Sequence, residues 1–257
     1  MPGIQVVLFD LGGTLLHYEQ PPENSFDVIN GRALMAFLQS AIRGGARVPD
    51  PELAGRAVAR MGAAMEARAR RTHHAFDVQE VIREGLAAVN VTVPEDAWTP
   101  AMAAYYDAVA TVAQPVAGDA SRVLETLAEQ GRSMGLVSNT AWSSAMHDAD
   151  LERFGLLDQL PVRVYSSDFG MVKPHPSIYR AALDRLDVAP AEGVFVGDKL
   201  DVDVAGPQKI GMRTVLVASP YREENDPEIQ PDARISSIDE LPALLEAWDR
   251  EMEDAVP

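Results

Sequence analysis

The chain has 257 residues with 47% hydrophobic content, which suits one large folded domain or a core with a smaller companion. Its formal charge of −17 argues against binding nucleic acid or an anionic membrane over a broad surface, because both require a basic footprint. The sequence contains no cysteine, which excludes disulfides, thiol catalysis and thiolate metal sites.

The N-terminal segment predicts a buried strand. Ile4 to Phe9 is a short apolar run, typical of a central parallel strand that is covered on both faces, and Asp10 follows its end. No basic segment precedes this run, so we interpret it as a strand and not as a signal peptide. No apolar stretch approaches the roughly 18 residues that a membrane helix requires. We therefore expect a cytoplasmic protein with no membrane partner.

Residues 17–113 are predicted to be helical. Four segments rich in Ala, Arg, Met and Glu have this character: Ser25–Ile42, Pro51–Arg71, Val78–Val89 and Pro94–Ala113. Asp50-Pro51 is a helix-start signal, and Gly44-Gly45 stops the helix before it. We interpret this block as a helical cap inserted after the first strand.

Strands and helices alternate from residue 114 onward. The predicted strands are Ser133–Val137, Val162–Tyr165, Val194–Val196 and Thr214–Val217. The predicted helices are Ala120–Glu129, Ser143–Arg153, Ser177–Leu186, Val202–Ile210 and Ile238–Met252, and Ala218–Arg234 is expected to be a long loop. Such alternation implies right-handed βαβ units and a parallel sheet. We predict an α/β, Rossmann-like core, formed by residues 1–16 and 114–257, that carries the cap.

Four polar motifs, far apart in the chain, each end or closely follow an apolar run. They are Asp10 in V-V-L-F-D-L-G-G-T-L, Ser138 in G-L-V-S-N-T, Lys173 in M-V-K-P, and Asp198 with Asp203 in V-F-V-G-D-K-L-D-V-D. Parallel strands deliver such residues to a shared crevice at their carboxyl ends. In order and context, the four motifs resemble the signatures of the haloacid dehalogenase-like (HAD) hydrolases.

The resemblance implies a nucleophile and a metal site. Asp10 is the expected nucleophile, since a carboxylate can form a covalent ester with phosphorus or carbon and divide one hard step into two. Asp10, Asp198 and Asp203 offer the hard oxygen ligands that Mg²⁺ prefers, and Gly12 is expected to add its backbone carbonyl. Asp201 competes with Asp203 for the outer acidic position, and the family spacing favours Asp203.

The resemblance also implies a phosphate-binding set made of Thr14, Ser138, Asn139 and Lys173, with Lys173 as a second catalytic residue that stabilises charge on the transferring group. Lys173 has independent support, because only three of the 22 basic residues are lysines. A lysine retained against this bias suggests a place where a compact ammonium is needed. The same reasoning applies to Lys199, beside Asp198, although a solvated surface lysine is an equal alternative.

Four further residues are weaker candidates. His73 and His74 follow a basic run and either form an anion-steering rim, supply a proton or lie on a solvated helix face. His17 is a candidate proton donor near Asp10. Trp142 either lines the active-site pocket or packs in the core.

Gly12 is the main departure from the family pattern. HAD phosphatases usually carry an aspartate there, which protonates the leaving oxygen and then activates water, and general acid–base help of this kind is worth roughly 10²–10⁴-fold. We predict a Mg²⁺-dependent phosphohydrolase acting on a small phosphorylated metabolite. The alternatives are a 2-haloacid dehalogenase, whose halide leaves without a proton, and a binding protein that keeps the metal and phosphate pocket without turnover. The retained Gly197-Asp198 and the acids after it favour metal chemistry over dehalogenation.

Overall fold

β1 (Val6–Phe9) lies at the centre of a six-stranded sheet with the order β5-β4-β1-β6-β7-β8. The computed structural model describes residues 3–18, 26–110, 113–116, 118–219 and 226–254. The other strands of this sheet are β4 (Ser133–Ser138), β5 (Val162–Tyr165), β6 (Gly193–Gly197), β7 (Arg213–Val217) and β8 (Ala233–Ile235). Every neighbouring pair is parallel, so the predicted α/β class is confirmed.

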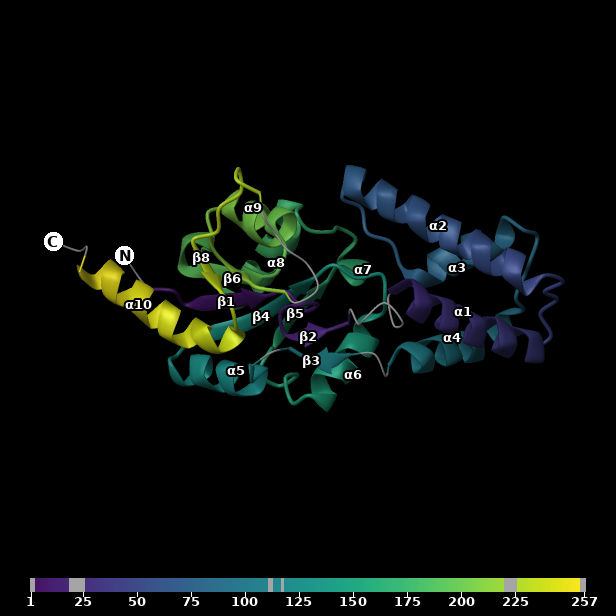
Figure 1. Cartoon of the computed structure of the whole chain (residues 1–257), viewed down its shortest axis with the longest axis horizontal. Helices are drawn as coiled ribbons and strands as arrows, with labels where there is room; N and C mark the ends of the chain where they lie inside the picture. Colours follow the sequence, from purple (N-terminus) through teal and green to yellow (C-terminus); the bar gives the residue numbers. More distant parts are fainter. Residues whose placement is uncertain (1–2, 19–25, 111–112, 117, 220–225, 255–257) are drawn as a thin grey trace.

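Helices cover both faces of the sheet (Figure 1). One face carries α5 (Ala120–Glu129), α6 (Ser144–Arg153) and α10 (Leu241–Asp254), and the other carries α8 (Pro176–Leu186) and α9 (Ala205–Gln208). Successive residues of β1 alternate between these layers. Val7 and Phe9 pack in the cluster that contains Leu124 of α5, whereas Val6 and Leu8 pack with Tyr179 of α8. β1 is buried on both faces because both layers cover it.

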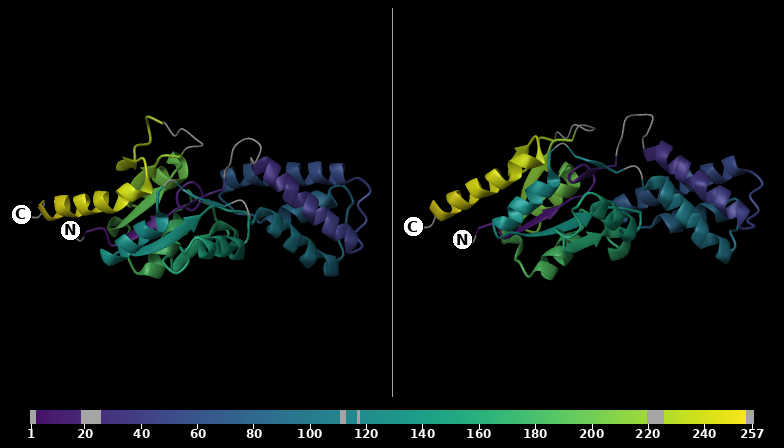
Figure 2. Two further views of the ribbon diagram at one scale, coloured as in Figure 1. Left: turned by 60° about the horizontal axis from the view of Figure 1, so that its bottom comes forward. Right: turned by 90° about the horizontal axis from the view of Figure 1, so that it is seen from below.

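A block of four helices, α1–α4, lies beyond one end of the sheet, opposite α10 (Figures 1 and 2). Its members are α1 (Phe26–Arg43), α2 (Pro51–Thr72), α3 (Val78–Ala87) and α4 (Glu95–Val109). α1 packs against α4, and α2 packs against α3. β2 (Leu16–His17) pairs antiparallel with β3 (Gln114–Pro115), so the segments that enter and leave the helical block run side by side.

Several predicted boundaries require correction. β8 forms at the end of the segment that we expected to be a loop, and it is a short edge strand with little apolar pattern to signal it. The predicted helix Val202–Ile210 is confirmed only in part, because its bounds and its first turn differ. The chain forms a π-helical turn over Leu200–Val204 followed by the short α9, in which Pro207 offers no backbone N–H.

Two short helical elements were not predicted: α7 (Ser166–Phe169), which follows β5, and a 3₁₀ turn (Pro190–Glu192), which precedes β6. The predicted helix Ile238–Met252 begins with a 3₁₀ turn (Ile238–Glu240) before α10. Ser25 and residues 111–112, which belong to predicted helices, lie outside the described residues. Among the helices of the described ranges, none has the length and apolar character needed to cross a bilayer.

Candidate active site

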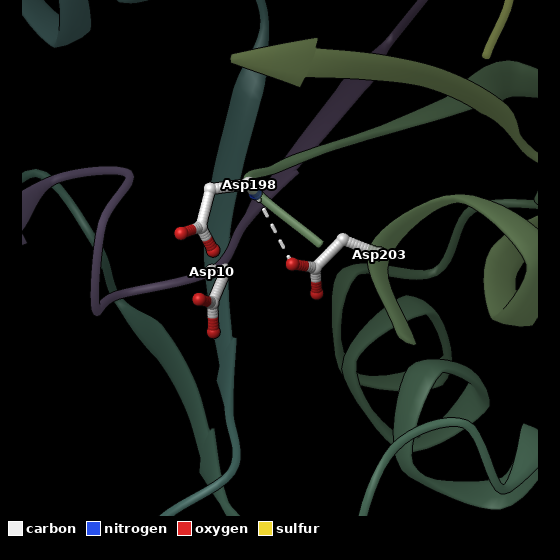
Figure 3. Close-up of side chains that lie close together, drawn as sticks. All are labelled: Asp10, Asp198 and Asp203. Atoms are coloured by element: carbon white, nitrogen blue, oxygen red, sulfur yellow. Dashed lines mark hydrogen bonds between the residues drawn. The ribbon is translucent and has the colours of Figure 1, made fainter. Parts of the chain in front are cut away.

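Three carboxylates converge at the carboxyl end of the sheet (Figure 3). Asp10 directly follows β1, Asp198 directly follows β6, and Asp203 lies in the π-helical turn. One oxygen from each lies within 4.8 Å of the others, and all three side chains are buried. Asp10 and Asp198 meet because β1 and β6 are adjacent and parallel, with Phe9 in register with Val196.

Lys173 joins two of these carboxylates. Its Nζ donates one hydrogen bond of 2.7 Å to Asp10 Oδ1 and another of 2.7 Å to Asp203 Oδ1. Burial disfavours the ammonium, but the charges of Asp10 and Asp203 outweigh it and raise the pKa of Lys173 above its usual value. The Phe195 ring, 5.1 Å from Nζ, adds a cation–π contact. Lys173 is therefore a fixed positive charge beside the expected nucleophile.

Asp203 anchors the turn that carries it. Its Oδ2 accepts hydrogen bonds from the backbone N–H groups of Asp198, at 3.2 Å, and Lys199, at 3.0 Å. Burial raises the pKa of Asp203 to about 6, although Lys173 opposes the change. Gly197 permits this arrangement, because a Cβ there would lie only 2.4 Å from Asp203 Cβ. Asp201, the competing acid, is exposed, so the geometry favours Asp203.

The glycines after Asp10 have different roles. Gly13 has a φ of +92°, and a Cβ on it would lie 2.3 Å from Asp198 Oδ2, so only glycine fits. Gly12 has no left-handed φ, and the nearest atom to a Cβ built on it is Cδ2 of Tyr18, at 3.7 Å. The fold therefore requires glycine at position 13 and would accept a side chain at position 12.

The predicted phosphate-binding residues differ in their burial and in their hydrogen bonds. Ser138 ends β4 and is buried, and Thr14 is fully buried with no hydrogen-bond partner for its hydroxyl among the described residues. The side chain of Asn139 is committed to the Lys173 backbone: its amide donates to the carbonyl at 3.0 Å, and its oxygen accepts from the N–H at 2.7 Å. Asn139 thus positions the loop of Lys173, and its contact with phosphate remains a prediction.

A buried aromatic cluster, which no sequence pattern indicated, lies beside Gly12. The Tyr18 ring meets Trp142 and His147 edge-on, at centroid distances of 5.9 and 5.5 Å. Thr140 Oγ1 lies 2.7 Å from His147 Nε2, and the Tyr18 hydroxyl lies 3.1 Å from His147 Nδ1 while it donates to Asp150. This pattern fits a neutral imidazole protonated on Nδ1, and burial lowers the pKa of His147 to about 4.

The weaker candidates lie on separate elements of the structure. His17 is buried on β2 and lines a small cavity together with Thr14. Trp142 is 7% exposed and packs against Tyr18, so it belongs to the buried aromatic cluster. His73 and His74 follow α2 and contact the chain just before Lys173.

Comparisons with known proteins show the family of this chain. The family model of the haloacid dehalogenase-like hydrolases matches residues 4–211. The chain therefore belongs to the haloacid dehalogenase-like hydrolase family, as the four motifs predicted. The match includes all four motifs and the helical block between them.

Two curated relatives are phosphatases. The chain is 34% identical over 134 residues to a ribulose-1,5-bisphosphate 5-phosphatase from Halopiger xanaduensis, a match that covers 49% of this chain and 55% of the relative. It is 35% identical over 153 residues to a glyceraldehyde 3-phosphate phosphatase from Pyrococcus furiosus, covering 58% and 60%. The chain thus spans little more than half the length of these relatives.

A solved structure of the other functional class shares the fold. The 2-haloacid dehalogenase from Pseudomonas syringae pv. Tomato superposes with a TM-score of 0.68 at 24% identity, covering 95% of this chain and 99% of that one. Phosphatases and dehalogenases therefore both occur among the proteins similar to this chain, and the choice between these activities depends on the residues of the site.

Proposed function

We propose that the protein is a Mg²⁺-dependent phosphohydrolase that acts on a small phosphorylated metabolite through an aspartyl-phosphate intermediate. The observation that carries this proposal is the charge of the buried cluster. Three carboxylates face one ammonium, from Lys173, which leaves two negative charges when all four groups are ionised. Buried charge of this size requires compensation, and a divalent cation supplies it.

The donors present fit such a cation. Asp10, Asp198 and Asp203 provide oxygen atoms within 4.8 Å of one another, and the backbone carbonyl of Gly12 is the further ligand that we propose. A bound Mg²⁺ would neutralise phosphate charge and fix the geometry of the transferring group.

Each protein group has a role in the proposed reaction. An oxygen of Asp10 attacks phosphorus, the bond from phosphorus to the leaving oxygen breaks, and water later hydrolyses the aspartyl ester. Lys173 holds Asp10 Oδ1 and so fixes the orientation of the carboxylate. The hydroxyls of Ser138 and Thr14 donate to phosphoryl oxygens. Gly12 offers no acid for the leaving oxygen.

We propose that residues 17–113 form a cap over the carboxyl end of the sheet, with the core formed by residues 1–16 and 114–257. The helical block lies beyond that end and is joined to the core through the β2–β3 pair (Figure 2). A cap limits the size of the substrate that can reach Asp10. The two curated relatives are named for a sugar bisphosphate and a triose phosphate, and these names support a small phosphorylated metabolite as the substrate.

A 2-haloacid dehalogenase is the second candidate. Gly12 favours it, since halide leaves without a proton, and the fold matches that of a solved dehalogenase. Displacement at carbon needs no metal, however, and would leave the excess negative charge of the cluster without a function. This alternative therefore explains Gly12 but not why Asp198 and Asp203 both lie in the buried cluster.

A paired substrate panel tests the proposal. Phosphate esters and 2-haloacids are assayed with Mg²⁺ and with EDTA, for the wild type, for Asp10→Asn and for the exposed control Asp201→Asn. We expect phosphatase activity that EDTA abolishes, a loss of about a thousandfold or more in Asp10→Asn, and little change in Asp201→Asn. Haloacid turnover that is insensitive to EDTA would select the dehalogenase. Binding of Mg²⁺ and phosphate without turnover would select a binding protein.

A further inference from the structure

The π-helical turn that brings Asp203 into the carboxylate cluster places a demand on its own backbone (Figure 3). In a π-helix, the carbonyl of each residue accepts a hydrogen bond from the N–H five residues later, as the carbonyl of Leu200 does from Ala205. For Val202, which directly precedes Asp203, that later position is Pro207, and proline has no N–H. A continued π-helix could therefore not satisfy the carbonyl of Val202, so this buried turn calls for a donor from outside.

The side chain of Tyr179, on α8, provides such a donor. Its hydroxyl donates to the carbonyl of Val202, and the whole residue is buried. Burial raises the pKa of Tyr179 above its usual value, and the negative charges of Asp203 and Asp10 act in the same direction. The hydroxyl therefore keeps its proton and its role as a donor.

The surroundings of Tyr179 fix the direction of this hydroxyl. The Tyr179 ring meets the ring of Phe195, on β6, edge-on at a centroid distance of 5.4 Å. Gly206, in α9, lies against the other end of the phenol, where a Cβ would overlap the hydroxyl oxygen, so only glycine fits there. The phenol is thus packed between β6 and α9, with its hydroxyl directed at Val202.

We infer that Tyr179 is a positioning residue for Asp203, whose hydroxyl holds the π-helical turn in the conformation that directs this carboxylate into the cluster. The consequence for metal binding rests on the proposed function, whereas the positioning itself does not. Val202 is the chain neighbour of Asp203, so a shift of the Val202 carbonyl moves the Asp203 Cα with it. Groups that orient a metal ligand without touching the metal change its affinity by roughly 10–100-fold when they are removed.

Asp203 tolerates little displacement, because both of its oxygens are hydrogen-bonded. Oδ1 accepts from Lys173 Nζ at 2.7 Å, and Oδ2 accepts from the backbone N–H groups of Lys199, at 3.0 Å, and Asp198, at 3.2 Å. A displaced turn would lengthen these bonds and open the two N–H groups to exchange with water. The amides of Asp198 and Lys199 therefore report the position of Asp203 even when no metal is bound.

The variant Tyr179→Phe tests the inference, because it removes the hydroxyl and keeps the ring. The matched control is Tyr105→Phe, since Tyr105 is also buried and its hydroxyl donates to Asn30, at 3.1 Å, inside the helical block. In calorimetric titrations of the whole chain, we expect the Kd for Mg²⁺ to rise by about tenfold in Tyr179→Phe and to stay within about twofold of the wild type in Tyr105→Phe. An unchanged Kd in Tyr179→Phe, or an equal rise in both variants, would overturn the inference.

A double variant shows whether the effect passes through Asp203. Asp203→Asn removes the charge and keeps one oxygen that can still bind the cation. Tyr179→Phe should then weaken Mg²⁺ binding by less than about twofold when it is added to Asp203→Asn, because the residue that it positions is already impaired. Losses of affinity that multiply in full would show that the hydroxyl acts on another group and would contradict the positioning of Asp203.

Hydrogen exchange in the metal-free protein separates the positioning from the proposed function. We expect the amides of Asp198 and Lys199 to exchange about tenfold faster in Tyr179→Phe than in the wild type. The amide of Ser133, which bonds the carbonyl of Gln5 at the other end of the sheet, should not change. A wild type that binds no Mg²⁺ would refute the proposed metal site, and the exchange rates would still decide the positioning. Unchanged exchange at both amides would overturn it.

Discussion

Gly12 lies two residues after the expected nucleophile, where a carboxyl group would be able to protonate a leaving oxygen. The backbone does not explain the glycine, because its φ is not left-handed and the space beside it is open as far as Tyr18. Without an acid, negative charge accumulates on the leaving oxygen in the transition state. The rate should therefore depend steeply on the pKa of the leaving group, with aryl phosphates cleaved faster than alkyl phosphates.

Restoring the acid is the direct test of this view. We expect Gly12→Asp to raise alkyl-phosphate turnover by up to about a hundredfold and aryl-phosphate turnover by much less. Gly12→Asn, which has the same size but no acidic proton, is the control. Wild-type rates that are equal for all leaving groups would contradict the prediction, and a pre-steady-state burst would then show whether a later step limits the rate.

Replacing Lys173 with arginine tests whether the site requires a compact ammonium. Its side chain is 1% exposed and lies between Asp10 and Asp203, so the longer, forked guanidinium of Lys173→Arg should misplace both carboxylates. We expect kcat to fall on the order of a hundredfold, with a loss of about 1–3 kcal/mol in stability from overpacking. Lys199→Arg is the control, because Lys199 is only half-buried. A near-normal kcat for Lys173→Arg would refute the argument from lysine scarcity.

At the scale of elements, α6 is tied to the active-site loops by one buried imidazole. His147, on α6, contacts Thr140 of the loop after Ser138 and Tyr18 of the segment after β2. Its ring stacks on Tyr165 of β5 with a centroid distance of 5.4 Å. A charged imidazole would lose the acceptor that Thr140 uses, so this junction between elements depends on His147 remaining neutral.

The depressed pKa of His147 predicts acid sensitivity. Burial lowers that pKa from 6.5 to about 4, so between these values the unfolded chain binds a proton that the folded chain does not. The free energy of unfolding therefore keeps its full value, as far as His147 is concerned, above pH 6.5. It decreases by about 3 kcal/mol as the pH falls from 6.5 towards 4. Denaturant unfolding of the metal-free protein at several pH values measures it. The His147→Gln variant should show a flatter dependence, and a parallel one would contradict the assignment.

At the scale of the whole molecule, the formal charge of −17 surrounds a site that is itself rich in carboxylates. Such a protein attracts divalent cations from all sides, but only ligands that converge in a buried cluster hold one specifically. Binding to the native state alone stabilises a protein in proportion to the logarithm of the free ligand concentration.

Thermal unfolding with Mg²⁺ tests the metal site without any assay of activity. At a concentration a hundredfold above Kd, we expect about 2.7 kcal/mol of stabilisation and a Tm that rises by about 5–10 °C. Asp198→Ala should remove most of this increase, whereas Asp201→Ala, which changes an exposed acid, should keep it. Equal increases in Asp198→Ala and the wild type would indicate non-specific cation binding.

The sequence by itself determined the fold class, the family and the order of the site motifs. Apolar runs such as Val6–Phe9 identify parallel strands because burial on both faces leaves few polar positions. Parallel topology then places the residues at the strand ends along one edge of the sheet, which is why Asp10 and Asp198 could be paired in advance. Local patterns suffice for such inferences, because strand periodicity and the order of the motifs depend only on residues that are close together in the sequence.

Only the tertiary structure decided which distant groups meet. The family spacing favoured Asp203 over Asp201, but the π-helical turn that brings Asp203 into the carboxylate cluster has no periodic pattern that would predict it. The pairing of His73–Ala75 with Gly170–Val172 joins segments about a hundred residues apart through backbone groups, which carry no residue-specific signal. The contacts of Tyr18 with His147 likewise depend on side-chain directions that packing alone fixes. The physical reason is common to all three: these contacts are set by turn geometry and packing between elements, which local sequence does not encode.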